Sequence, residues 1–368
     1  MSDRDVLSPR QLTAAAFVAI LSPLVRRFPR ALAAAVGRCA WLSVLLSALP
    51  TALLLLVIRL FYRKQQPHTG FADILTGTLG RLPGRALTGL YGIWFLAYAG
   101  VLLRSGADRF ISTVYPCAWP GVFVSVTAAL CLIAALGRTV SLARTAILIR
   151  PLMAALIVAV FLLSAKDLDL GLLFPVTEAE LLPCAGGALQ LTNILASAAF
   201  LVFFSDQLRG AFRPRDYLGW VVALIVLLLL MTVSCLGVFG AGLTARMTYP
   251  FFLLVRDLSV LGSLERAEPV ILALWALSDF IMISLLLQAA GKTLAFCFCS
   301  AKQPSGKTAR RPLLLLVAAA AATEALLIPG DMATFLLLSE SVVPLLNAVF
   351  AFLLPLPVLG IGLLRKTL

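Results

Sequence analysis

The feature that most constrains this chain is a series of uninterrupted apolar runs, each about as long as a membrane is thick. The run 217–243, for example, contains no Asp, Glu, Lys or Arg. A helix needs about 20 such residues to cross the hydrocarbon core of a bilayer. The whole chain is 61% hydrophobic and only 13% charged, whereas charged residues make up about a quarter of a soluble domain. We therefore predict an all-α polytopic membrane protein, and not a β-barrel, whose strands alternate in polarity.

Charge clusters divide these runs into ten predicted transmembrane helices. They cover residues 10–34, 39–61, 86–114, 119–137, 142–164, 186–207, 217–243, 267–298, 312–329 and 339–364. The first is the least regular, because Ser22-Pro23 interrupts it and proline removes a backbone hydrogen-bond donor. Three arginines, Arg26, Arg27 and Arg30, follow this interruption. The charged residues ahead of this long span argue against a cleavable signal peptide.

Membrane topology explains the formal net charge of +13 better than a nucleic-acid partner does. If the N-terminus is cytoplasmic, the inner connections hold most of the Lys and Arg residues, including the groups within 59–85, 209–215 and 302–311. Such an excess on one side sets the orientation of a membrane protein. We therefore expect both termini to be cytoplasmic.

Two long connections are amphipathic and suit short helices that lie in the membrane interface. One covers about 66–84 on the predicted inner side, and the other covers about 246–264 on the outer side. One follows the second span and the other the seventh, as expected for two inverted repeats of five spans. We predict a single transmembrane domain, 1–368, with repeats at about 8–164 and 186–364. A ten-helix bundle without internal symmetry is the alternative, because no residue-level repeat is visible.

Four short motifs stand in a distinctive order along the chain. They are Leu7-Ser8-Pro9-Arg10-Gln11-Leu12, Trp41 after Gly37 and Ala40, Arg104 and Asp108 before Ile111 and Pro116, and Tyr249-Pro250, Arg256 and Leu264-Glu265-Arg266 before Trp275. In order and spacing they resemble the spore germination permease family, the B subunits of the nutrient germinant receptors of bacterial endospores. The likeness covers nearly the whole chain.

The resemblance implies a LeuT-like fold of the amino acid–polyamine–organocation superfamily. It also implies a place in the spore inner membrane beside an A-type subunit and a C-type lipoprotein subunit. A B subunit would bind a small nutrient germinant, often an amino acid, and help to trigger ion release. The chain departs from the family after the first-span break, where Arg26, Arg27 and Arg30 stand instead of an apolar stretch. Arginines at such a helix end suit an anionic group.

For the ligand pocket we predict facing groups from the first, third, sixth and eighth spans. An inverted-repeat transporter holds its ligand near the bilayer midplane, between discontinuous helices. Ser22 and Pro23 would supply unwound backbone, and Tyr98 would supply a ring and a hydroxyl. The remaining candidates are Ser197, Phe200, Ser284 and Gln288. Ordinary helix packing is the alternative for each, because small and polar residues also serve helix contacts in lipid.

Ionisable residues inside a membrane are costly, so each needs a reason. Arg104 and Asp108 lie four residues apart on one helix face, which indicates a mutually neutralising pair or, alternatively, a gate. The other candidates for an ion path are Arg150, Asp279 and Glu324. The alternatives are a kink beside Arg150 and, for the carboxylates, a hydrogen bond to a neighbouring helix.

The outer connection before the eighth span carries Tyr249, Arg256, Glu265 and Arg266. We interpret these residues as part of an outer lid or of a docking surface for a partner subunit. A surface ion-pair cluster of little energetic weight is the alternative for the charged ones.

No residue pattern indicates an enzyme, a cofactor or a metal site. The only histidine is His68, and Gly291-Lys292-Thr293 lacks the earlier glycine of a phosphate-binding loop. We therefore expect a receptor subunit that binds a small nutrient and signals germination. A proton- or sodium-coupled secondary transporter for an amino acid or amine is the main alternative, and a membrane scaffold without a pocket is a third.

Overall fold

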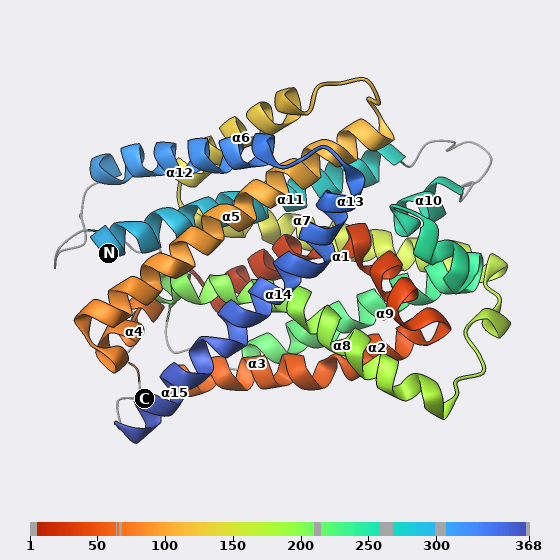
Figure 1. The fold of residues 1–368 in the computed structure, drawn as a ribbon, viewed down its shortest axis with the longest axis horizontal. Helices are drawn as coiled ribbons and strands as arrows, with labels where there is room; N and C mark the ends of the chain where they lie inside the picture. Colours follow the sequence, from red (N-terminus) through yellow and green to blue (C-terminus); the bar gives the residue numbers. More distant parts are fainter. Residues whose placement is uncertain are drawn as a thin grey trace.

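The protein is described by a computed structural model that covers residues 6–63, 65, 68–209, 215–257, 268–298 and 307–365. Within these ranges the chain is helical and contains no β-strand, apart from one isolated bridge between Leu7 and Leu208. Most of the helices run lengthwise through an elongated bundle (Figure 1). The structure confirms the prediction of an all-α membrane protein.

The helices of the described residues follow one another along the chain. Their bounds are α1 Pro9–Val36, η2 Gly37–Cys39, α2 Ala40–Leu46, α3 Ala48–Phe61, α4 Phe71–Leu79, α5 Arg81–Thr113, α6 Pro120–Leu136, α7 Thr139–Ser164, η3 Ala165–Asp167, η4 Leu170–Leu172, η5 Glu178–Glu180, α8 Leu181–Leu195, η6 Ala196–Gln207, α9 Arg215–Arg246, α10 Pro250–Asp257, α11 Glu268–Phe298, α12 Lys307–Leu327, α13 Met332–Leu337, η7 Leu338–Val342, α14 Val343–Ala348, η8 Val349–Leu353 and α15 Pro355–Leu364.

Seven helical stretches in the described part of the chain are long and apolar enough to cross a membrane. They are Phe28–Phe61, Arg81–Thr113, Thr139–Asp167, Leu181–Gln207, Leu218–Arg246, Pro269–Phe298 and Leu338–Leu364. A shorter apolar helix covers Pro120–Leu136. The predicted spans 10–34 and 312–329 fall on α1 and α12, which carry charged residues near their ends or midpoints.

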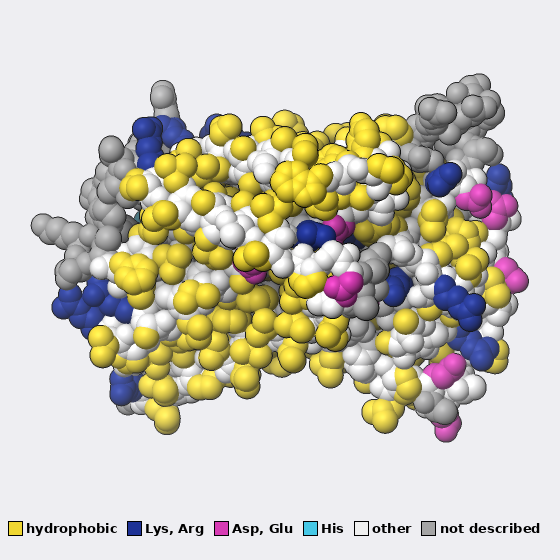
Figure 2. Space-filling model, turned by 45° about the horizontal axis from the view of Figure 1, so that its top comes forward, with side chains coloured by type: hydrophobic (Ala, Val, Ile, Leu, Met, Phe, Trp, Pro, Cys, Tyr) yellow, Lys and Arg dark blue, Asp and Glu magenta, His cyan; other side chains and the backbone are white. Residues whose placement is uncertain are grey.

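The charged ends and the apolar middle of the molecule fit a bilayer. Large apolar side chains such as Leu49, Ile133 and Leu148 are mostly exposed. Figure 2 shows hydrophobic side chains in a broad band, with most Lys, Arg, Asp and Glu side chains gathered at the two ends. We name these ends after the short helices α4 and α10, which lie at opposite ends of the bundle (Figure 1). Since lipid tails are apolar, the band is the surface that the membrane would cover.

Helix α1 lies at the centre of the bundle and contacts α7, α8, α9, α10 and α11. A capping box starts it: Gln11 N–H donates to Ser8 Oγ, and the Ser8 amide donates to Gln11 Oε1. The helix continues through Pro23 instead of ending at the predicted interruption. At this point the Ser278 hydroxyl contacts the helix backbone: it accepts from the Ser22 amide and donates to the Val18 carbonyl. In an uninterrupted helix these two backbone groups would bond to each other.

The sixth predicted span changes its helix type halfway. The α-helix α8 ends at Leu195, and the 3₁₀ helix η6 continues to Gln207. Runs of 3₁₀ helix longer than three or four residues are uncommon and often mark a functional hinge. At its far end η6 is tied to the N-terminal segment, since the Leu7 amide donates to the Gln207 carbonyl over 2.7 Å.

Candidate functional site

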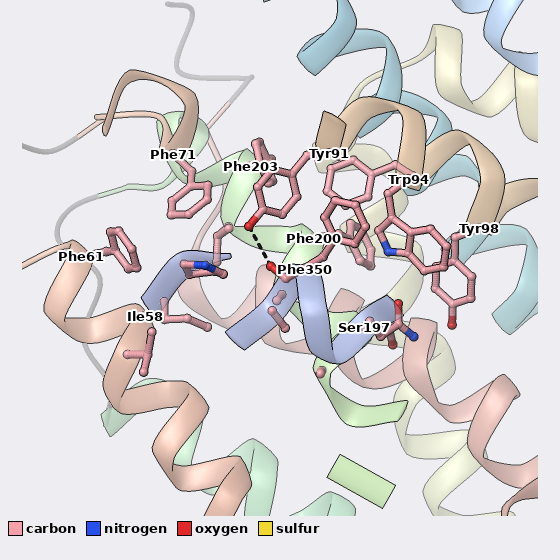
Figure 3. Close-up of a pocket in the computed structure, with 18 of the residues that line it drawn as sticks. Ile58, Phe61, Phe71, Tyr91, Trp94, Tyr98, Ser197, Phe200, Phe203 and Phe350 are labelled. Carbon is pink, nitrogen blue, oxygen red and sulfur yellow. Dashed lines mark hydrogen bonds between the residues drawn. The ribbon is translucent and has the colours of Figure 1, made fainter. Parts of the chain in front are cut away.

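An aromatic pocket lies between α3, α4, α5, η6 and the α14–η8 segment (Figure 3). Trp94 stacks on both Tyr98 and Phe350, with ring centroids 5.7 and 5.4 Å apart. The Tyr91 hydroxyl donates to the Phe350 carbonyl over 2.7 Å, which fixes one wall. Phe203 closes the side toward α4, packing edge-on against Phe71. The lining is almost entirely apolar, as expected for a small-molecule site with few orienting polar groups.

A second cavity, the Arg26 cavity, adjoins the aromatic pocket on the side of α10. Both cavities are lined by Tyr98 and Asn347, so they meet at these two residues. The Arg26 cavity also has polar walls, formed by Arg26, Ser105, Gln190, Ser339 and Glu340. The two cavities measure about 40 and 50 Å³. One water molecule needs about 10–15 Å³ of cavity volume, so each cavity has room for only a few waters. Side chains must therefore move before an amino-acid-sized ligand can enter.

A buried charge cluster joins α1, α5 and α11 beside these cavities. Asp279 receives hydrogen bonds on both carboxylate oxygens, from the Ser22 hydroxyl and from Arg109 Nη2, the latter over 2.6 Å. Both partners of this ion pair are almost fully buried, with side-chain exposures of 4% for Asp279 and 1% for Arg109. The Arg109 guanidinium also lies 5.8 Å from the centre of the Trp275 ring. The cluster is therefore rigidly held.

The charge cluster contains two cations and one anion. Arg26 is 3% exposed, and Asp279 attracts its guanidinium while Arg109 repels it. Two nitrogens of Arg26, Nε and Nη1, are buried and make no hydrogen bond within the described part of the chain. Burying a guanidinium without a bonded partner costs several kcal/mol, roughly. The arrangement therefore leaves capacity for one more anion.

Helix α10 covers the charge cluster from the end of the bundle. Tyr249 and Phe252 are buried, and the ring of Phe252 lies 5.9 Å from that of Trp275. Arg256 is exposed on the opposite face of the helix. Glu265 and Arg266 lie outside the described residues. The buried face of α10 thus separates the cluster from the surface.

The structure brings together five of the seven predicted pocket residues. Tyr98, Ser197 and Phe200 line the aromatic pocket, and Pro23 lines the Arg26 cavity. Ser22 precedes Pro23 and does not line either cavity, and its hydroxyl donates to Asp279. Figure 3 shows Tyr98 and Ser197 at the same end of the aromatic pocket.

Ser284 and Gln288 do not join this group. The Gln288 amide donates to the Ala135 carbonyl and accepts from the Thr139 hydroxyl. Ser284 lies near Cys131 of α6. Both side chains therefore face α6 and the start of α7. Because residues 281–290 of α11 are all buried, the i, i+4 spacing of Ser284 and Gln288 selected one face of the helix but not the face toward Tyr98.

The predicted gating residues have separate surroundings. Arg104 contacts Asp108 over 3.0 Å and donates through Nη1 to the Ile328 carbonyl, just beyond the end of α12. This geometry favours the interpretation as a neutralising pair that also links α5 to α12. Arg150 is exposed on α7, so its side chain faces away from the bundle interior. Glu324 is half-buried on α12 against Gly100, whose missing side chain makes room for the carboxylate.

An additional ion pair closes the α4 end of the bundle. Lys292 of α11 binds Asp206 of η6 and also donates to the Phe203 carbonyl over 2.7 Å. Burial raises the pKa of the nearby Asp73 carboxyl on α4, and the Asp206 charge adds to this rise. The contacts hold η6 against α11 and block access to the aromatic pocket from this end.

Sequence reasoning missed Arg109, Asn347 and the Lys292–Asp206 pair as parts of the site. A signal existed for Arg109, which is a third ionisable residue in the span that holds Arg104 and Asp108. No local signal marks Asn347. An isolated amide in an apolar helix looks the same in the sequence whether it lines a pocket or packs against another helix.

Comparisons with known proteins bear on the family and the fold of the chain. A family model described as spore germination protein matches residues 6–324. A solved Na+-coupled sialic acid symporter, substrate-bound and outward-open, is similar with a TM-score of 0.61 and 11% sequence identity, over 94% of this chain and 79% of that one. MhsT in complex with L-phenylalanine also has a TM-score of 0.61, with 14% identity over 96% and 97% of the two chains. These neighbours have the LeuT fold. No curated protein matches the chain.

Proposed function

The chain belongs to the spore germination protein family, and from this membership we propose that it is the membrane subunit of a spore germinant receptor. It would bind a small nutrient, an amino acid or a similar molecule, near the middle of the membrane. Binding would then signal germination and ion release. The observation that carries the proposal is the meeting of the aromatic pocket and the Arg26 cavity at Tyr98 and Asn347.

The shape of the site supports binding followed by a conformational change. Both cavities are small and covered, by α10 at one end and by the Lys292–Asp206 pair at the other. A ligand that binds an open form better than this closed form shifts the population toward the open form. The 3₁₀ helix η6, which lines the pocket and holds Asp206, is the element best placed to move.

The proposal includes a finer description of the fold. We propose ten transmembrane helices in a 5+5 inverted repeat within one domain, with repeats at about 8–164 and 186–364. The LeuT-fold neighbours support this arrangement. The position of α4 and α10 at opposite ends of the bundle also supports it. The excess of Lys and Arg at the α4 end favours cytoplasmic termini.

Partner subunits complete the proposed receptor. We place the chain in the spore inner membrane with an A-type subunit and a C-type lipoprotein subunit. The exposed face of α10 and the following residues, including Arg256, Glu265 and Arg266, are the proposed docking surface. We assign the chain binding and signalling rather than a chemical reaction.

A secondary transporter is the second candidate. The observation that favours it is the buried Asp279, which links α1 to α11 at the centre of a transporter fold. A proton- or sodium-coupled carrier of amino acids or amines would show substrate-driven ion flux when the purified chain is placed in liposomes. A receptor subunit would bind the same nutrient without such turnover.

Spore germination assays test the receptor proposal. We expect Tyr98→Ala and Phe200→Ala to raise the nutrient concentration needed for half-maximal germination by about 10-fold or more, since each removes a large buried ring from the pocket. Leu148→Ala, on the exposed face of α7, is the matched control and should respond like the wild type. Unchanged nutrient responses of both pocket variants, at normal protein levels, would contradict the proposal.

A further inference from the structure

Arg26 is a buried ionisable group that has no directly bonded partner among the described residues. Its guanidinium lines a cavity, it is 3% exposed, and its Nε and Nη1 atoms make no hydrogen bond to any described residue. Buried charges are normally paired and hydrogen-bonded. A buried arginine without such a partner, beside a cavity, is suited to bind an anionic group that enters the cavity.

The acidic residues around Arg26 are already bound elsewhere. Both oxygens of Asp279 are taken by Ser22 and Arg109. Glu340 lines the same cavity, but its Oε1 atom accepts from Arg30 Nη1 over 2.9 Å. Tyr98 and Tyr249 also lie close to Arg26, but neither is a carboxylate. The positive charge of Arg26 is therefore attracted by Asp279 at a distance but is not neutralised by a direct contact.

Arg109 does not have the same role, although it also has unbonded nitrogens. Its guanidinium is bound to Asp279 and lies between the rings of Phe110 and Trp275. It does not line the Arg26 cavity or the aromatic pocket. Arg109 positions Asp279, whereas Arg26 faces the space where a ligand would lie.

We propose that the nutrient carries an anionic group, a carboxylate above all, and that Arg26 binds this group in the Arg26 cavity. The inference rests on the proposed function, because it assumes that the two cavities form the nutrient site. Guanidinium and carboxylate have matching planar geometry and form paired hydrogen bonds. The class of ligand is then a small carboxylic acid with an apolar body.

The neighbouring pocket defines the rest of this ligand. A carboxylate on Arg26 would place the apolar body toward Tyr98, where the aromatic pocket begins. Trp94, Tyr98 and Phe350 form a stack that can cover an apolar side chain. A free inorganic anion such as chloride could satisfy Arg26 equally well, but it would make no use of this stack.

The test measures binding to the purified full chain by isothermal calorimetry and by thermal unfolding. The probes are L-alanine, L-leucine and L-phenylalanine, each compared with its own amide, which keeps the ammonium group and the side chain but lacks the carboxylate. The buffer contains sucrose instead of salt, and a second series adds sodium chloride. The variants are Arg26→Gln, Arg26→Lys and, as a control, the exposed Arg38→Gln on η2.

We expect at least one acid to bind about 10- to 100-fold more tightly than its amide, the range that a charged hydrogen bond contributes. Arg26→Gln should remove this preference and leave the affinity for the amide unchanged. Arg26→Lys should keep part of it, and Arg38→Gln should behave like the wild type. If Arg26→Gln does not fold, the comparison of acid with amide on the wild type still decides whether the site prefers a carboxylate.

Three other results would overturn the assignment, each in a different way. Equal binding of acids and amides would refute the anion site but leave the proposed nutrient pocket intact. An unfolding temperature raised by chloride alone, through Arg26 and with no further effect of the acids, would show that Arg26 holds a free anion. Binding by none of the six probes would contradict the proposed nutrient pocket itself.

Discussion

At the scale of single residues, Ser278 shows how a hydroxyl of one membrane helix bonds to the backbone of another. Its hydroxyl lies between the Val18 carbonyl and the Ser22 amide of α1. Pro23 follows at once and has no amide hydrogen to continue the ladder. The Ser22 hydroxyl is then directed to Asp279, which in turn holds Arg109. These contacts between α1, α5 and α11 form a polar centre in an otherwise apolar bundle.

This chain of contacts predicts the behaviour of Asp279 variants. Asp279→Asn leaves Arg109 buried without its anion, so we expect a loss of about 3–5 kcal/mol of stability. The double variant Asp279→Leu, Arg109→Leu should recover part of this loss, because it removes both members of the ion pair and leaves only Arg26 as a buried charge in the cluster. Thermal unfolding of the purified chain measures both effects. Lys166→Gln, at an exposed position, serves as the control.

Equal destabilisation by the single and the double variant would show that the ion pair is not the source of the effect. In that case the hydrogen bond from Ser22 or the packing of α11 would have to account for it.

At the scale of elements, α10 and η6 control the two ends of the site. Helix α10 has one buried face, with Phe251, Phe252, Leu254 and Val255, and one exposed charged end. Its contacts with α1, α9 and α11 cover the charge cluster. At the other end η6 is fastened by Lys292 and by the bridge to Leu7. Opening on either side thus requires one short element to move, while the long helices stay in place.

We predict that Phe252→Ala loosens α10 without unfolding the bundle. The ring is buried against Trp275, and truncating a buried phenylalanine costs about 3–5 kcal/mol. Since α10 is only a short helix at the end of the bundle, the loss should appear as local opening. Hydrogen exchange of residues 250–257 should become faster, while that of α5 should not. Val270→Ala, at an exposed position of α11, is the control, and uniform acceleration would contradict local opening.

At the scale of the whole molecule, the apolar band and its charged ends determine how the protein sits in a membrane. The α4 end carries Arg81 and Arg85, and the α10 end carries Lys166, Asp167 and Glu178. A membrane protein keeps its Lys-rich and Arg-rich connections on the cytoplasmic side. In the proposed orientation the two ends lie in different compartments, and the Arg26 cavity is nearer to the outer one.

This orientation predicts opposite reactivity of engineered cysteines at the two ends. In a variant without the native cysteines, Lys166→Cys should react with a membrane-impermeant maleimide in intact cells. Arg81→Cys should react only after the membrane is permeabilised. Mass spectrometry of the purified chain measures both. Labelling of Arg81→Cys, but not Lys166→Cys, in intact cells would reverse the proposed topology.

The sequence by itself determined the class of the molecule and its family. Apolar runs as long as a bilayer is thick allow only helices here, because every backbone group must bond within its own segment. Local reasoning also selected Ser22 and Pro23 as candidates, because a proline affects the backbone of its neighbours. The choice of Tyr98, Ser197 and Phe200 rested on the pocket expected between the spans of an inverted repeat.

Only the tertiary structure decided which buried polar groups meet. Asp279 and Arg109 are 170 residues apart, and no periodicity states which face of α5 turns toward α11. For the same reason Gln288 was assigned to the pocket although it faces α6. In a helix surrounded by protein, all faces are apolar, so the hydrophobic pattern carries no direction. The rotation of each helix is set by packing. Packing therefore also decided that Arg26 lines the cavity.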